Sequence, residues 1–125
     1  MPSSHLSIVL IDESEIIASR LKSLLAGIAG FRLAAHARNI SEGYLICLNE
    51  TPDLILLDSW LPDGTGISML RELNKKYPGI KIIILSNSGS HYYKDKCLEL
   101  GAAAVLDKSA DLPELQEILL RLLNE

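Results

Sequence analysis

The stretch LLDSWLPDGTG, residues 56–66, runs from apolar residues into a carboxylate, Asp58, and then into a loop with one proline and two glycines. Residues 53–58 have the length and the apolar continuity of a buried strand. A charge at the end of such a strand is costly unless it is paired or used in chemistry. An ordinary turn-forming aspartate is the alternative. The strands around it decide between the two.

Strand and helix patterns alternate along the whole chain. Besides residues 53–58, the expected strands are residues 6–11, 31–38, 81–86 and 102–106. The expected helices are residues 14–28, 40–49 and 65–77, a segment that ends at Leu100, and residues 111–123, with Asn39 and Asp111 as N-caps and Gly101 as a helix end. This alternation predicts an α/β fold, a doubly wound, five-stranded parallel sheet with five helices on its two faces. With the strand order 2-1-3-4-5, the fold is flavodoxin-like.

Composition limits the classes of function. The 125 residues predict one domain over residues 1–125, and 48% apolar content is typical of a folded core. A net charge of −4 argues against direct binding to nucleic acid or to an anionic membrane. Cys47 and Cys97 lack metal or redox spacing, which favours a reducing compartment. Without a signal-peptide pattern or an apolar run of about 20 residues, we expect a cytoplasmic protein with no membrane span.

Polar residues gather where the expected strands end. Asp12 and Glu13 follow the first strand, Asp58 ends the third, Ser86 ends the fourth, and Lys108 follows the fifth. The carboxyl ends of parallel strands share one edge of a sheet, where ligands bind at the point at which the strand order reverses. We therefore expect these five side chains to lie close together.

A magnesium-dependent phosphoryl transfer fits this set of residues. Clustered carboxylates repel and raise the pKa of at least one member unless a cation intervenes, and oxygen ligands favour Mg²⁺ or Mn²⁺. Asp58 can then attack a phosphoryl group as a nucleophile, with Lys108 neutralising its oxygens and Ser86 donating a hydrogen bond. The alternative for Asp12 is a capping box with Glu15 at the start of the first helix, and both roles remain open.

The chain resembles the receiver domains of two-component response regulators over its whole length. Asp12 and Glu13 match the family's acidic pair, Asp58 its phosphorylated aspartate, and Ser86 and Lys108 its conserved hydroxyl and lysine positions. The residues after Asp58, from Leu61-Pro62 to Thr65-Gly66, match the loop that follows that aspartate.

The resemblance implies a signalling domain rather than a turnover enzyme. Asp58 would accept a phosphoryl group from a histidine kinase or a phosphotransfer protein, and the backbone carbonyl of Trp60 would join Asp12, Glu13 and Asp58 as a metal ligand. Phosphorylation would draw in Ser86 and shift the population of conformations toward one that binds a downstream protein or a fused output domain. A homodimer is a further option.

Four positions depart from the family's pattern: Val105 replaces the aromatic residue three positions before the lysine, Ser109 replaces the proline after it, and Asn87 and Trp60 are bulky beside the site. An aromatic switch cannot operate at Val105, and no cis-proline fixes the loop after Lys108. We expect Asn87 and Trp60 to limit the access of water and so to set the lifetime of the phosphoryl group.

Three other classes of function are weaker alternatives. A haloacid dehalogenase-type phosphatase needs a second acid at the position of Trp60 and room for a cap domain. A flavin mononucleotide carrier needs a phosphate-binding loop, but residues 12–16, DESEI, are acidic and lack glycine. A phosphorylation-independent scaffold remains the main alternative. His5, His36 and His91 have no metal or triad spacing, and either packing or a partner face accounts for Tyr92 and Tyr93.

Overall fold

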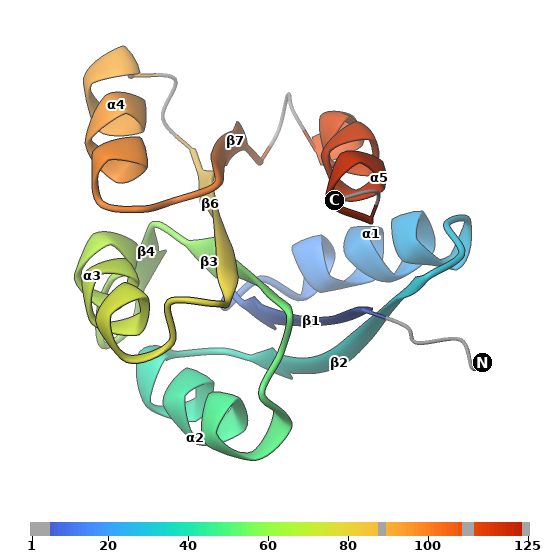
Figure 1. The fold of residues 1–125 in the computed structure, drawn as a ribbon, viewed down its shortest axis with the longest axis horizontal. Helices are drawn as coiled ribbons and strands as arrows, with labels where there is room; N and C mark the ends of the chain where they lie inside the picture. Colours follow the sequence, from blue (N-terminus) through green and yellow to red (C-terminus); the bar gives the residue numbers. More distant parts are fainter. Residues whose placement is uncertain (1–5, 88–89, 109–111, 124–125) are drawn as a thin grey trace.

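A computed structural model describes residues 6–87, 90–108 and 112–123 of the protein (Figure 1). Its elements, in chain order, are β1 (Leu6–Ile11), α1 (Glu15–Ala26), β2 (Phe31–Ala37), α2 (Ile40–Glu50), β3 (Leu54–Asp58), β4 (Trp60–Leu61), β5 (Gly64–Thr65), α3 (Gly66–Lys76), β6 (Lys81–Ser86), α4 (His91–Glu99), β7 (Ala104–Asp107), the 3₁₀ turn η1 (Leu112–Glu114) and α5 (Leu115–Leu123).

Five of the strands form one parallel sheet in the order β2-β1-β3-β6-β7. This order confirms the predicted 2-1-3-4-5 arrangement and the flavodoxin-like fold. The central strands β1, β3 and β6 are buried almost throughout, as expected for parallel strands covered on both faces. They read as continuous apolar runs in the sequence for the same reason.

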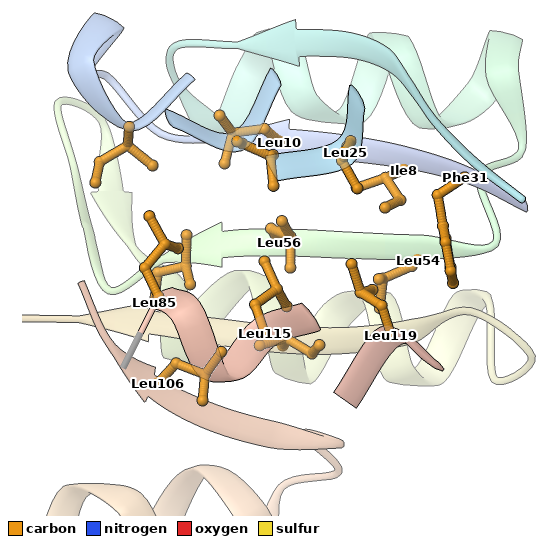
Figure 2. Packing of buried hydrophobic residues seen from close by; sticks show 14 of the residues in the cluster. Ile8, Leu10, Leu25, Phe31, Leu54, Leu56, Leu85, Leu106, Leu115 and Leu119 are labelled. Carbon is orange, nitrogen blue, oxygen red and sulfur yellow. The ribbon is translucent and has the colours of Figure 1, made fainter. Parts of the chain in front are cut away.

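Two apolar clusters cover the two faces of the sheet. The first cluster lies between the sheet and the helices α1 and α5, and Figure 2 shows part of it, with Leu56 of β3 near Leu115 of α5. The second cluster lies between the other face and the helices α2, α3 and α4. In Figure 1, α1 and α5 accordingly lie on one side of the sheet and α2, α3 and α4 on the other.

The helix ends mostly follow the predicted signals, with one correction. Asn39 caps α2 by accepting a hydrogen bond from the N–H of Glu42 at 2.8 Å. Gly101 follows α4 with a φ of 108°, a left-handed conformation that favours glycine. The alternative role of Asp12 in a capping box with Glu15 is excluded, because Ser14 is the N-cap of α1 and accepts from Ile17 N–H at 3.2 Å.

Other differences are small. The last strand begins at Ala104 rather than at residue 102, and a two-stranded antiparallel hairpin, β4-β5, lies in the segment predicted as a loop. The cap predicted at Asp111 and the departure noted at Ser109 fall outside the described residues. Cys47 and Cys97 are both buried and unpaired. Among the elements described, no helix has the length and apolar content needed to cross a membrane.

Candidate functional site

Two buried carboxylates lie at the carboxyl edge of the sheet, where β1 and β3 end beside each other. Ile11 pairs with Leu57 in the parallel ladder, so Asp12 and Asp58 occupy neighbouring strand ends. The exposed fraction is 1% for Asp12 and 6% for Asp58. Two like charges with so little access to water require a cation nearby.

Lys108 supplies that cation. It follows β7, and its backbone N–H donates to the carbonyl of Ser86 at 2.9 Å. Its Nζ lies 2.7 Å from Asp12 Oδ2 and 3.0 Å from Asp58 Oδ1, and its side chain is only 11% exposed. The structure therefore brings together three of the residues that the sequence selected, from three different strand ends.

The environment of Asp58 disfavours its charged form. Burial raises the pKa of its carboxyl group above the usual value of 3.8, and the charge of Asp12 raises the pKa further. The ion pair with Lys108 and the N–H of Trp60, which lies 3.4 Å from Oδ1, lower it in part. Burial contributes more to this rise than the repulsion by Asp12 does.

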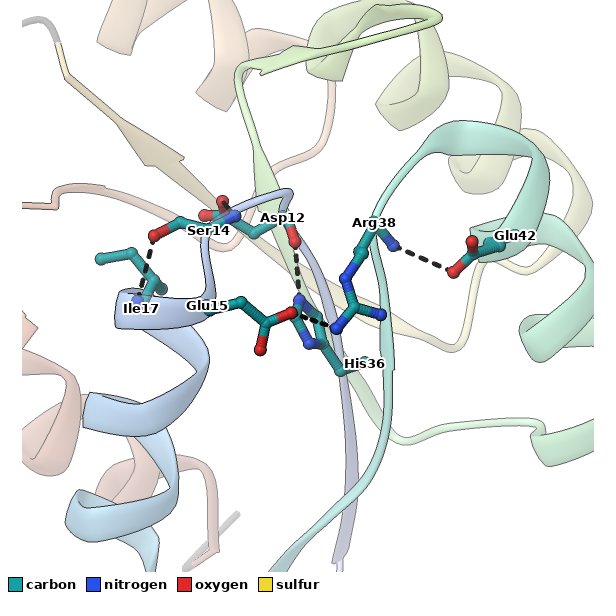
Figure 3. Close-up of polar contacts among 7 residues, drawn as sticks. All are labelled: Asp12, Ser14, Glu15, Ile17, His36, Arg38 and Glu42. Atoms are coloured by element: carbon teal, nitrogen blue, oxygen red, sulfur yellow. Dashed lines mark hydrogen bonds and ion pairs between the residues drawn. The ribbon is translucent and has the colours of Figure 1, made fainter.

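Backbone and side-chain donors fix the position of Asp12 (Figure 3). Its Oδ1 accepts a hydrogen bond from Ser14 N–H at 2.9 Å, and its backbone N–H donates to Ala37 O at 2.9 Å. His36 Nε2 lies 2.7 Å from the carbonyl oxygen of Asp12 and donates to it in the tautomer or charge state that protonates this nitrogen. The spacing of His36 in the sequence gave no sign of this role.

An exposed ion pair bridges α1 and the strand β2 beside this site. Arg38 contacts the carboxylate of Glu15, and its backbone N–H donates to Glu42 Oε1 at 3.2 Å (Figure 3). Exposed pairs of this kind contribute little free energy. The pair tethers the start of α1 to the segment between β2 and α2 without adding a charge to the buried site.

The backbone after Asp58 is held by a close approach that only glycine permits. A Cβ atom added to Gly66 would lie 2.3 Å from the carbonyl oxygen of Asp58, and Gly66 N–H donates to Ser59 O at 2.9 Å. The first turn of α3 therefore packs directly on the backbone of the candidate nucleophile. The β4-β5 hairpin fills the intervening residues and leaves Trp60 72% exposed.

Asp63 joins the hairpin to α2. Its carboxylate accepts hydrogen bonds from Ile40 N–H at 2.8 Å and from Ser41 N–H at 3.1 Å, at the start of the helix. These hydrogen bonds lower the pKa of Asp63, as expected for a carboxylate at a helix N-terminus. The contact between Ile40 and Asp63 spans 23 residues of sequence, so no local pattern indicates it.

The remaining predicted residues surround this centre less tightly. Ser86 is buried at the end of β6, whereas Glu13 and Asn87 are exposed. A pocket of about 300 Å³ opens next to Lys108, and its walls are Ser14, Ile16, Ile17, Arg20, Asn87 and Lys108. Lys108 is the one member of the charged centre that lines this pocket.

One atom of the site has an unused acceptor position. Asp12 Oδ2 is buried and receives no hydrogen bond from the described residues, although Lys108 Nζ lies 2.7 Å away, so that contact is ionic without hydrogen-bond geometry. A carboxylate oxygen in this condition suits a hard divalent cation. In the part of the chain that the structure describes, no three acidic, histidine or cysteine side chains are gathered into a metal cluster.

The fold and this centre define a class of protein: a flavodoxin-like domain with a lysine between two buried acids at its switch point. The family model of the response regulator receiver domain matches residues 8–120. The chain therefore belongs to this family and is a receiver domain of two-component response regulators. Phosphorylation is general to the family.

Individual relatives agree with this assignment. The chain is 32% identical over 110 residues to the KDP operon transcriptional regulatory protein KdpE of Escherichia coli and 29% identical over 114 residues to the transcriptional regulatory protein DegU of Brevibacillus brevis. These matches cover 88% and 91% of this chain but only 48% of each relative, so the chain spans about half their length. A LuxR-family response regulator from Aurantimonas has a similar structure, with a TM-score of 0.87, 26% identity, and coverage of 97% of this chain and 86% of that one.

Proposed function

We propose that Asp58 is the phosphoacceptor of this receiver domain and that a histidine kinase or a phosphotransfer protein is its donor. The observation that carries the proposal is the position of Lys108 Nζ between Asp12 Oδ2 and Asp58 Oδ1, at 2.7 and 3.0 Å. A buried lysine that contacts both acids lies where it can neutralise the oxygens of a phosphoryl group carried by Asp58.

The transfer uses one carboxylate oxygen of Asp58. Both polar contacts of this carboxylate within the described residues go to Oδ1, which leaves Oδ2 as the nucleophile. Oδ2 forms the new bond to phosphorus while the bond from phosphorus to the imidazole nitrogen of the donor breaks. The electron pair of that bond returns to the imidazole, which then takes up a proton. Lys108 and the hydroxyl of Ser86 stabilise the phosphoryl oxygens.

Asp12, Glu13, Asp58 and the backbone carbonyl of Trp60 are the proposed ligands of a magnesium ion, with manganese as a substitute. The oxygen-only set and the unused acceptor position of Asp12 Oδ2 support this choice. Such an ion supplies positive charge that offsets the phosphoryl oxygens during transfer.

The wider role follows from the same proposal. Residues 1–125 would act as one cytoplasmic signalling domain without turnover of a separate substrate, and the phosphorylated form would bind a downstream protein or a fused output domain. Direct contact of this domain with nucleic acid or membrane is not expected at a net charge of −4. A homodimer of the phosphorylated form remains compatible with this role.

Acetyl phosphate with Mg²⁺, followed by intact mass measurement, tests the proposal. We expect one added phosphoryl group on the wild-type chain and on Asp95→Asn, a control that changes an exposed acid of α4. Asp58→Asn should gain none. Modification of Asp58→Asn, or none of the wild type, would contradict the assignment. The scaffold alternative instead expects a partner to bind equally well before and after phosphorylation and to Asp58→Asn.

A further inference from the structure

Helix α4 begins with two adjacent tyrosines that lie in different environments. Tyr92 is 80% exposed, whereas Tyr93 is half-buried and packs against the second cluster, the one under α2, α3 and α4. Val105, which stands where receiver domains often have an aromatic residue, packs against the same cluster. An aromatic ring is therefore present on this side of the sheet, but α4 supplies it rather than β7.

The hydroxyl of Tyr93 is buried and unsatisfied. Among the described residues it has no hydrogen-bond partner, although Ser59 and Cys97 lie close enough to influence it. Burial raises the pKa of this hydroxyl far above its usual range, Cys97 and the charge of Asp58 raise it further, and Ser59 lowers it in part. The hydroxyl is thus a protonated donor within electrostatic range of the proposed phosphoacceptor.

A buried donor without an acceptor carries a desolvation cost that a new acceptor would remove. Ser59 follows Asp58 directly, is 5% exposed, and donates its backbone N–H to Leu85 O at 3.0 Å. A change at Asp58 therefore reaches the surroundings of Tyr93 through one peptide unit. Additional negative charge at Asp58 makes any rearrangement that satisfies this donor more favourable.

Helix α4 has few other anchors that would resist such a rearrangement. It has nine residues, and Cys97 is its only fully buried one. Tyr93 and Cys97 are four residues apart and share the inner face of the helix. An element with so little buried apolar surface shifts at a low cost in free energy.

We propose that Tyr93 couples the phosphorylation state of Asp58 to the position of α4, in place of an aromatic residue at position 105. In the unphosphorylated protein the hydroxyl stays unsatisfied. In the phosphorylated protein it donates to an acceptor at the end of β3, and α4 moves with it. This coupling rests on the proposed role of Asp58 as the phosphoacceptor.

Hydrogen exchange of α4, with and without Mg²⁺ and beryllium fluoride as a phosphoryl mimic, tests the coupling in the full chain. Tyr93→Phe removes only the hydroxyl, and Tyr92→Phe makes the same change on the exposed neighbour. We expect the mimic to alter exchange over residues 91–99 in the wild type and in Tyr92→Phe. Tyr93→Phe should lose that alteration while it keeps its fold, because the substitution removes an unsatisfied group.

Fluorescence of Trp60, the only tryptophan, reports loading of the site in the same samples. If Tyr93→Phe takes up the mimic and the exchange of α4 then changes as much as in the wild type, the coupling is wrong but the proposed function stands. The same holds if the wild type takes up the mimic with no change in α4. Failure of the wild type to load at all would overturn the proposed function, and the coupling with it.

Discussion

The two faces of the sheet are packed with chemically different side chains. Under α1 and α5, the first cluster consists of aliphatic residues and one aromatic ring, Phe31. Under α2, α3 and α4, the second cluster also contains sulfur atoms and tyrosine hydroxyls, from Cys47, Met69, Cys97, Tyr44, Tyr77 and Tyr93. Both faces are buried, so they differ in the chemistry of their side chains and not in their exposure to solvent.

This difference indicates which face is fixed and which can rearrange. Branched aliphatic side chains interlock in few rotamers, whereas methionine and cysteine are more adaptable and a tyrosine hydroxyl can change its partner. The aliphatic face includes Leu10 and Leu56, two positions before Asp12 and Asp58, whereas Ile11 and Leu57 belong to the other face. The other face carries α4, whose inner residues include Tyr93 and Cys97.

The largest expected effect is on the aliphatic face. Leu115 is fully buried in the first cluster, and Leu115→Ala should lower the free energy of unfolding by about 3 kcal/mol, because a rigid face cannot close the cavity. On the other face, Met69→Leu nearly conserves volume and should cost less than about 1.5 kcal/mol. Urea unfolding measures both. A cost below about 1.5 kcal/mol for Leu115→Ala would mean that this face relaxes too, and the comparison would fail.

A smaller but more local effect is expected where α3 packs on Asp58. Gly66→Ala would place a methyl group 2.3 Å from the carbonyl oxygen of Asp58, so the backbone there must shift. We expect a loss of about 2 kcal/mol in stability and slower phosphorylation of Asp58. Gly79→Ala is the matched control, because its Cβ would meet no atom within 4 Å. Equal phosphorylation rates for the two variants would show that the close approach does not position the acceptor.

The sheet and the main members of the site could be predicted from the sequence because both follow from strand ends. Buried parallel strands read as apolar runs, and a change from apolar to charged residues marks their carboxyl ends at Asp12 and Asp58. The strand order then brings these ends together. The hairpin β4-β5 was missed, since strands of two residues are too short to show any periodicity.

The contacts that support the site could not be predicted, because they depend on register between distant segments. His36 meets the carbonyl of Asp12 only because β2 pairs with β1 so that Leu10 lies opposite His36. The sequence left a capping role for Asp12 open because aspartate and serine, the residue at position 14, are both good cap residues by type. Which residue caps α1 depends on where β1 ends, at Ile11.

Removal of the charge on Asp58 should stabilise the protein at neutral pH. The pKa of Asp58 is raised in the folded state above 3.8, so the folded chain binds more protons than the unfolded chain as the pH rises through this range, and stability falls. Asp58→Asn has no carboxyl group to ionise at this position, so its stability does not fall in this way. Lys108 keeps its contact with Asp12 in the variant. We expect the Tm of the variant to exceed that of the wild type by about 4 °C at pH 7, equivalent to about 1 kcal/mol.

Thermal unfolding at several pH values tests whether Asp58→Asn is more stable than the wild type. The difference in Tm between Asp58→Asn and the wild type should vanish below pH 3.8 and grow as the pH rises above it. Asp95→Asn, at an exposed position of α4, should show no such dependence. A wild type more stable than Asp58→Asn at pH 7 would mean that the ion pair with Lys108 outweighs burial and repulsion.

The smallest expected effect concerns Asn87 and Trp60, the two bulky residues predicted to limit the access of water to Asp58. Asn87 lines the pocket beside α1, and Trp60 lies on the exposed hairpin beside α3. If each limits the access of water, Asn87→Ala and Trp60→Ala should each speed the loss of the phosphoryl group about twofold, equivalent to about 0.4 kcal/mol. Dephosphorylation followed by intact mass gives both rates. A change in only one variant would show that water enters from that side alone, and unchanged rates in both would exclude either residue as a barrier to water.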